Sequence, residues 1–150
     1  MKKIVMAIAL ATFSLVGASA LAQNTASGPM KDDQLYQSLG QQAGLESLMD
    51  VFVAGLLADP RTAVRFKKAN QKNLKAQLAD QFCMLSGGPC TYKGADMKTV
   101  HEDMNINKAE FHALVEILQE AMDSRSIPFA AQNKLLALLA PMHRDVIAEK

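Results

Sequence analysis

Residues 87–97 read GGPCTYKGADM, the chain reaches His101 four positions later, and this stretch decides how the protein folds on either side of it. With Ser86, the first three residues predict a helix end and a turn, because glycine adopts left-handed backbone and proline cannot continue a helix. Residues 96–103 can then form a short helix. Four residues spaced at i, i+3, i+4 and i+7 would share one side of it: Met97, Val100, His101 and Met104. The stretch therefore predicts two helices with a turn between them.

Upstream of this stretch, apolar residues recur at helical spacing. Residues 32–39 predict a short helix that ends at the following glycine, residues 45–57 carry a continuous apolar face, and residues 74–85 carry another. Asp59 and Pro60 predict the start of a short helix between the last two, because aspartate caps helices and proline fits their first position.

Downstream of the stretch, Asn107 and Glu110 have the spacing of a capping box at the start of a long helix. Pro128 opens a last helix, whose apolar stripe continues to Val146. No segment alternates apolar and polar residues, so no sheet is expected. The predicted fold class is all-α, with two long C-terminal helices packed on two central ones.

The N-terminus has the three parts of a secretory signal peptide. Two lysines precede an apolar run over residues 4–16, and small residues with an A-x-A pattern follow before Gln23. The run is short for a membrane span, which needs about 20 residues. We expect residues 1–22 to be a signal peptide, residues 23–32 a flexible leader and residues 33–148 the folded domain. The protein would then be periplasmic or secreted, without a stable membrane span after signal removal.

Two cysteines, Cys83 and Cys90, flank the predicted turn. Along an unbroken helix, with a rise of about 1.5 Å per residue, their Cα atoms would be too far apart for a disulfide. Because the turn lets the chain fold back, the two sulfurs can meet, and an even cysteine number in an oxidising compartment favours a disulfide. The alternatives are two buried thiols and, less favoured because the spacing is not C-x-x-C, a catalytic pair.

Composition excludes several classes of protein. A chain of 150 residues that is 49% hydrophobic and 21% charged forms one domain with a core and is not disordered. The net charge of +1 becomes −1 once the two lysines of the signal segment are removed, so an electrostatic nucleic-acid binder is not expected. Collagen, disulfide-dense miniproteins and multispan membrane proteins are excluded as well.

The chain has three histidines, His101, His112 and His143, and they are its main candidates for metal binding or catalysis. No H-E-x-x-H, C-x-x-C-H, G-x-G-x-x-G or Walker pattern occurs, and no Ser, Cys and His have the spacing of a nucleophile with its base. His101 shares a helix side with apolar groups and thioethers, where a neutral imidazole could bind a metal. A half-buried helix histidine is the commoner explanation of that pattern. His112 and His143 are expected at the surface.

An ordered set of residues along the chain carries a family resemblance. It comprises Leu35-Tyr36, Gly40, Phe52, Leu57-Ala58-Asp59-Pro60, Phe66, Gly87-Gly88-Pro89, Tyr92, Gly94, Met97-Lys98, Val100-His101, Ile106, Phe111, Pro128 and Leu139-Ala140-Pro141. This set resembles that of the truncated haemoglobins, most of all the first group of that family, and covers residues 33–147 without a large gap. The resemblance implies a two-over-two helical sandwich around one non-covalent haem b.

The same resemblance assigns residues to the haem. It places His101 at the proximal position, where the imidazole binds iron directly, as haem iron in proteins needs an axial ligand. Haem is a large apolar plate and needs apolar helix faces on both sides. The residues that would line its cavity are Phe52, Phe66, Leu74, Leu78, Phe82, Tyr92, Met97, Val100, Phe111, Val115 and Leu139. Ordinary core packing would explain each of these apolar residues equally.

The sequence departs from the family on the distal side. Where family members often have a tyrosine that donates a hydrogen bond to the bound gas, this chain has Val53, and the facing positions are Leu74 and Leu78. Gln77 and Gln81 are the nearby amides, and both could instead face solvent. We therefore expect an apolar distal pocket that holds oxygen loosely and favours carbon monoxide or nitric oxide.

The function that these observations favour is reversible binding of a diatomic gas, as a carrier or sensor, with no catalytic residue assigned. A haem enzyme, such as a nitric oxide dioxygenase or a peroxidase, is the alternative. An unknown reductase would then be a partner of the protein. A haem-free helical interaction protein or a methionine-assisted copper binder is a third and less favoured reading.

Overall fold

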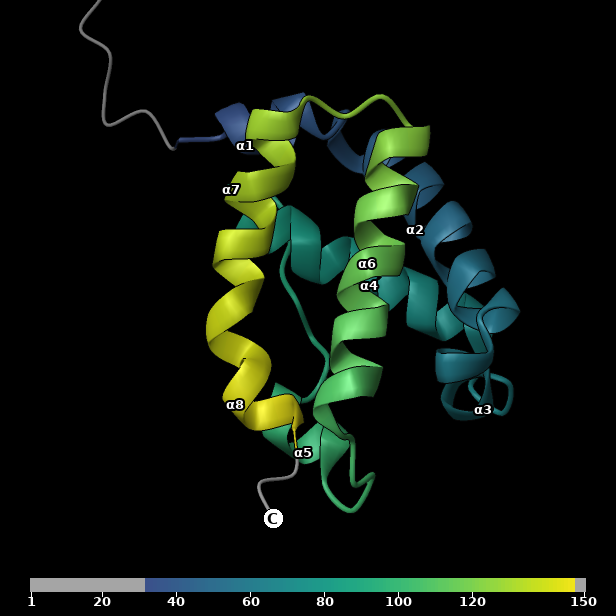
Figure 1. Cartoon of the computed structure of the whole chain (residues 1–150). Helices are drawn as coiled ribbons and strands as arrows, with labels where there is room; N and C mark the ends of the chain where they lie inside the picture. Colours follow the sequence, from purple (N-terminus) through teal and green to yellow (C-terminus); the bar gives the residue numbers. More distant parts are fainter. Residues whose placement is uncertain (1–31, 148–150) are drawn as a thin grey trace, which may run out of the picture. The chain divides into compact units, whose positions relative to one another are not determined.

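The computed structural model describes residues 32–147, and the regular structure in this range is entirely helical (Figure 1). The elements are α1 (Gln34–Ser38), α2 (Gln41–Ala58), α3 (Pro60–Phe66), α4 (Gln71–Leu85), α5 (Met97–His101), α6 (Lys108–Ser124), α7 (Phe129–Leu139), the 3-10 helix η1 (Ala140–Met142) and α8 (His143–Val146). The predicted signal peptide, residues 1–22, and all but the last residue of the predicted leader, residues 23–32, lie outside the described residues. Within 32–147, no helix is long and apolar enough to cross a membrane.

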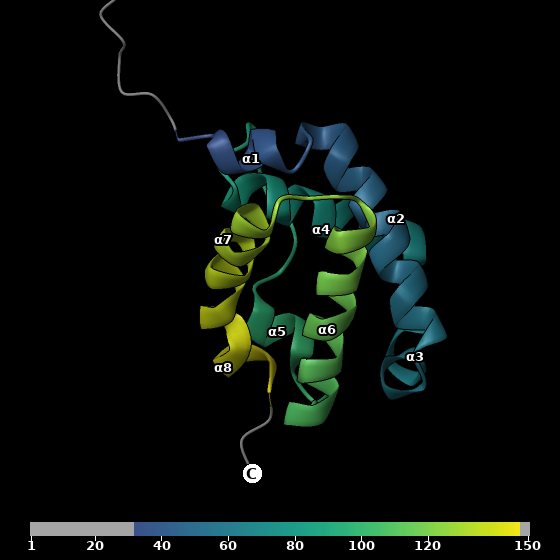
Figure 2. The same cartoon turned by 45° about the horizontal axis from the view of Figure 1, so that its top comes forward.

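The long helices form two layers, as predicted. Helix α2 packs against α4, and α6 stands beside α7 in front of them (Figure 1). The layers meet where α2 contacts α6 and where α4 contacts α7, while α1 lies at one end of α7 (Figure 2). The centre of the core is one face of α2, whose side chains are each at most 2% exposed: Leu45, Leu48, Met49, Phe52 and Leu56. The two-over-two arrangement follows from burying four apolar stripes against one another.

The predicted helix starts are confirmed by their hydrogen bonds. The side chain of Asp59 accepts from the Arg61 amide at 2.8 Å, and Pro60 occupies the first helical position of α3. At the start of α6, the Asn107 side chain accepts from the Glu110 amide at 2.9 Å, and the Glu110 carboxylate accepts from the Asn107 amide at 3.0 Å. Each contact satisfies an amide that the helix itself leaves unpaired.

The last helix differs from the prediction. A single helix from Pro128 to Val146 was expected, but α7 ends at Leu139 and the chain continues through η1 into the short α8. Pro141 explains the break, because it has no amide hydrogen to donate and its ring crowds the preceding turn. The break brings Met142 and α8 towards α5, which α8 contacts.

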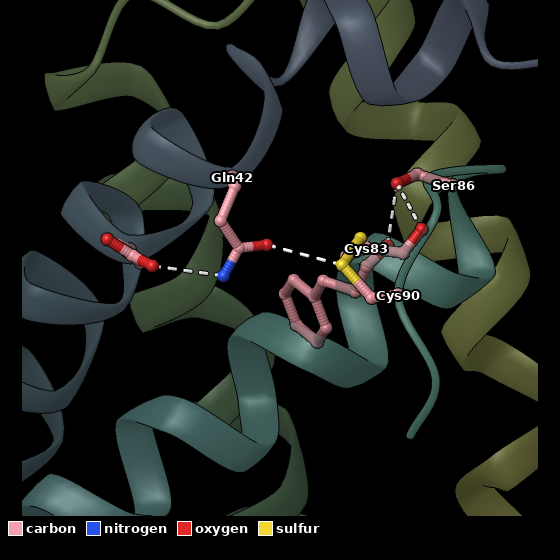
Figure 3. Close-up of a disulfide and its surroundings, with 6 residues drawn as sticks. Gln42, Cys83, Ser86 and Cys90 are labelled. Atoms are coloured by element: carbon pink, nitrogen blue, oxygen red, sulfur yellow. Dashed lines mark hydrogen bonds between the residues drawn. A yellow bond between two sulfur atoms is a disulfide. The ribbon is translucent and has the colours of Figure 1, made fainter.

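The turn after α4 brings the two cysteines together, and the predicted disulfide is formed (Figure 3). Cys83 and Cys90 have Cα atoms 5.8 Å apart. Gly87 has a φ of 89°, a left-handed conformation that glycine adopts without strain. A Cβ on Gly88 would lie 2.5 Å from the Cys83 sulfur, so the chain returns only because this position has no side chain. The alternative of two unpaired thiols is wrong.

Removing this cross-link should lower stability without changing the fold. A loop this short predicts a loss of about 2–3 kcal/mol in the free energy of unfolding when the disulfide is reduced. Urea unfolding with and without dithiothreitol measures the difference. The Cys83→Ala/Cys90→Ser double variant is the control, because its unfolding should not respond to reductant. Equal stability of the oxidised and reduced wild type would contradict the expectation.

Candidate functional site

A cavity of about 930 Å³ lies within the described domain, walled by α2, α4, α6, α7 and the segment around α5. The residues that the sequence assigned to a cofactor all line it: Phe52, Phe66, Leu74, Leu78, Phe82, Tyr92, Met97, Val100, Phe111, Val115 and Leu139. These side chains come from regions up to 87 residues apart in the chain, and folding brings them around one space. The walls are therefore mostly apolar.

His101 is the last residue of α5, is half-buried and lines this cavity. Its Nδ1 lies 2.7 Å from the backbone oxygen of Met97. Because a carbonyl oxygen only accepts, Nδ1 carries the hydrogen and donates it, and this selects the tautomer whose lone pair is on Nε2. A hydrogen bond of this kind fixes the tautomer and the ring orientation of metal-binding histidines. His101 is thus prepared to offer Nε2 to a metal inside the cavity.

The short helix that carries His101 is positioned by the segment before it. Asp96 caps α5, accepting from the Thr99 amide at 2.9 Å and from the Thr99 hydroxyl at 2.8 Å. These hydrogen bonds from Thr99 hold the pKa of the Asp96 carboxyl below its ordinary value. The Tyr92 hydroxyl donates to the Ala95 carbonyl at 2.9 Å, and burial raises its pKa, so it remains a donor at neutral pH.

On the distal side, the structure places Val53 beside the cavity rather than on its wall. Val53 is fully buried, but the α2 residues that line the cavity are Phe52 and Leu56, one helical turn apart. The next residue along a helix points about 100° away, which turns Val53 into the surrounding core. The distal wall above them is formed by Leu74 and Leu78, neither of which can donate a hydrogen bond.

Gln77 and Gln81 of α4 both line the cavity and neither is exposed, so the alternative that they face solvent is wrong. Gln81 is 5% exposed, and its Nε2 lies 3.7 Å from the Met97 sulfur and 3.8 Å from the Met142 sulfur. Gln77 differs, because its buried Oε1 has no hydrogen-bond partner in the described part of the chain. An amide oxygen and nitrogen can exchange places by a flip, so the same group can present a donor there.

The other two histidines lie at the edge of the site. His112 is exposed, as predicted, and contributes to the cavity rim. His143 is half-buried and meets the ring of Phe111 edge-on, with centroids 5.0 Å apart, so the surface expectation for it was wrong. The break at Pro141 accounts for this, because it separates α8 from α7 and allows His143 to pack on α6.

Sequence reasoning missed several parts of the wall. The additional lining residues include Leu56, Asn70, Asn73, Leu114, Glu116, Leu118, Leu136 and Met142. Leu114 and Leu118 continue the stripe of Phe111 and Val115, so helical periodicity was a sufficient signal for them. Met142 also belongs to the predicted stripe of the last helix, but its contact with Gln81 depends on η1, which that stripe did not predict.

Two arginines tie the α2–α3 side to α6. Arg65 donates to both carboxylate oxygens of Glu110, at 2.9 and 3.2 Å, and to the Met104 carbonyl at 2.7 Å. The Arg65 guanidinium holds the pKa of Glu110 below its ordinary value. Arg61 bridges Asp59 and Glu116 in a more exposed position. Arg65 lies in α3 beside Phe66 of the cavity wall, so this network joins α3 to α6 and to the loop after α5.

The residues of the cavity fit haem. Its volume falls within the range of about 300–1,000 Å³ typical of ligand sites, and its apolar walls suit a large flat ring. A half-buried imidazole with a free lone pair and a buried amide without a partner are the polar features that an iron-bearing ring and its ligand require. Within residues 32–147, no group of three or more His, Cys, Asp or Glu side chains could hold a metal ion.

Comparison with known proteins gives consistent matches. The family model described as bacterial-like globin matches residues 34–148. The group 1 truncated haemoglobin of Tetrahymena pyriformis is 27% identical over 119 residues, which cover 79% of this chain and 98% of that protein. The one from Tetrahymena thermophila is 35% identical over 88 residues, 59% of this chain and 73% of that protein. The crystal structure of the Tetrahymena pyriformis protein in its Fe(III) form superposes with a TM-score of 0.73, covering 77% of this chain and 98% of the other.

Proposed function

The chain belongs to the bacterial-like globin family, and from this premise we propose that it binds a diatomic gas reversibly at haem iron held by His101. Membership of this family implies haem binding. The observation that carries the more specific proposal is the hydrogen bond from Nδ1 of His101 to the Met97 carbonyl, which leaves Nε2 free in a cavity of about 930 Å³. The absence of a C-x-x-C-H motif favours non-covalent haem b.

The residues that line the cavity would have different roles in binding haem. Haem would supply an iron atom that binds the gas. His101 would hold the iron through Nε2, and the Met97 carbonyl would increase the basicity of the ring. Phe52, Phe66 and Phe82 belong to the apolar wall that would bury the ring and exclude water.

Among the α4 residues expected to face the gas, one is left to donate a hydrogen bond to it. Leu74 and Leu78 cannot donate, and the Gln81 amide is directed at two sulfurs. Gln77 remains, a half-buried residue whose carboxamide oxygen is buried without a hydrogen-bond partner in the described residues. A single amide stabilises a polarised ligand less than a set of several donors, so we propose that oxygen is held loosely and that carbon monoxide or nitric oxide is held without such help.

We also propose that the protein acts outside the cytoplasm, in the periplasm or as a secreted protein. The N-terminal signal pattern supports this location, and the Cys83–Cys90 disulfide is a bond that persists in oxidising compartments.

Substitution of the proposed iron ligand should abolish the native haem spectrum. We expect His101→Gly to lose haem or show a shifted Soret band, and added imidazole to restore the spectrum by filling the space of the missing ring. Absorption spectra of the reduced and oxidised protein measure this. His112→Gly, at the rim of the same cavity, is the matched control and should keep the wild-type spectrum. An unchanged spectrum in His101→Gly would refute the assignment.

Removal of the distal amide should affect oxygen selectively. We expect Gln77→Leu to raise the oxygen dissociation rate about ten- to a hundredfold, the value of one hydrogen bond to a charged acceptor, and to leave carbon monoxide dissociation nearly unchanged. Stopped-flow ligand displacement measures both rates. Gln71→Leu makes the same change at an exposed position of α4 outside the cavity and should leave both dissociation rates unchanged. A wild-type oxygen rate in Gln77→Leu would show that Gln77 donates nothing to the ligand.

Export should be visible as processing of the full chain. Expressed in a bacterium with two membranes, the protein should appear in the periplasmic fraction or the medium with Gln23 as its first residue. N-terminal sequencing and mass measurement determine this. A version that lacks residues 2–22 should stay in the cytoplasm. Full-length protein found only in the cytoplasm would contradict the proposed location.

A further inference from the structure

Gln81 makes an unusual set of contacts for a residue of the distal helix. It belongs to α4, is 5% exposed, and its Nε2 lies 3.7 Å from the sulfur of Met97 in α5 and 3.8 Å from the sulfur of Met142 in η1. The amide therefore spans from the distal side of the cavity to the segments that surround His101. Both sulfurs, like the amide, belong to residues that line the cavity.

Met97 receives two hydrogen bonds at opposite ends of the residue. Its sulfur accepts from Gln81, and its backbone oxygen accepts from Nδ1 of His101 at 2.7 Å. A displacement of Met97 that shifts its backbone also moves the carbonyl that fixes the imidazole. One residue thus connects the distal amide to the proximal ligand.

The helix that carries His101 depends for its position on contacts with neighbouring segments. It is five residues long, none of its side chains is fully buried, and Val100 is 46% exposed. A helix of this length is not stable by itself, so its position depends on contacts with other elements. It contacts α8, which begins directly after Met142, the second residue that Gln81 contacts. Gln81 therefore contacts α5 itself, through Met97, and the residue directly before α8, through Met142.

The alternative is that Gln81 only fills space in the core. Burial argues against this, because an amide removed from water is costly unless it keeps hydrogen-bond partners, and a leucine of similar size would fill the space without that cost. A thioether is a weak acceptor, but contacts of this kind strengthen where water is excluded. The two sulfur contacts therefore give the amide a defined direction, towards α5 and η1.

We propose that Gln81 is a positioning residue for His101, acting through Met97, and that it sets the geometry of the iron ligand without contacting the gas. The proposal rests on the proposed function, in which His101 binds haem iron. It gives Gln77 and Gln81 separate roles, with Gln77 acting on the gas and Gln81 acting on the proximal side.

The test compares Gln81→Leu with Gln77→Leu, the same change one helical turn earlier. We expect Gln81→Leu to shift or broaden the iron–histidine stretching band in resonance Raman spectra of the ferrous protein. Haem release to an acceptor apoprotein should accelerate about tenfold, as losses of partners behind metal-binding histidines do. Gln77→Leu should leave the iron–histidine band at its wild-type frequency. Thermal unfolding of each apoprotein checks that the variants fold.

Met97→Leu provides the second arm, because it removes the sulfur and keeps the backbone carbonyl. It should reproduce the band shift of Gln81→Leu, and the double variant should shift no further, since both changes break one connection. Additive shifts, or a wild-type band and haem release rate in Gln81→Leu, would overturn the proposal. If the wild type itself has no iron–histidine band that His101→Gly removes, the proposed function fails; if that band exists and Gln81→Leu leaves it unchanged, only the positioning role fails.

Discussion

The hydrogen bond from Nδ1 of His101 to the carbonyl of Met97 is the interaction on which the use of the cavity depends. It decides which ring nitrogen keeps a lone pair, and hence whether the half-buried imidazole can bind a metal. The bond is local, spanning one helical turn, so the short α5 supplies donor and acceptor together. Its geometry nevertheless depends on how α5 is held, since a five-residue helix cannot hold itself.

The partners of the polar side chains distinguish their roles within an otherwise apolar space. His101 has one nitrogen satisfied and one free. Gln81 is directed at the sulfurs of Met97 and Met142. Gln77 has a buried oxygen without a partner among residues 32–147. In a cavity of low polarity an unsatisfied group is costly, so the free nitrogen and the unpaired amide indicate where a metal and its ligand would be stabilised.

Local signals explain which parts of this structure could be predicted from sequence. The Asp59 and Asn107 caps and the turn after α4 each depend on residues close together in the chain, and these were predicted correctly. The contact between Gln81 and Met142 spans 61 residues and depends on a bend that Pro141 introduces, so no local pattern encodes it. Val53 shows a second limit, because a difference of one residue in helix phase moves a side chain from the cavity wall into the core.

The segment from Cys83 to His101 links the gas side of the cavity to the iron side. The disulfide bonds Cys90, in this segment, to Cys83 near the end of α4. The Tyr92 hydroxyl and the Asp96 cap then form hydrogen bonds directly before and at the start of α5. Gln81, two residues before Cys83, reaches the far end of the same segment through Met97. Helix α4 thus holds this segment covalently at one end and by a hydrogen bond at the other. Because α4 also carries Leu74, Gln77 and Leu78, a change in its position acts on the gas pocket and on the imidazole together.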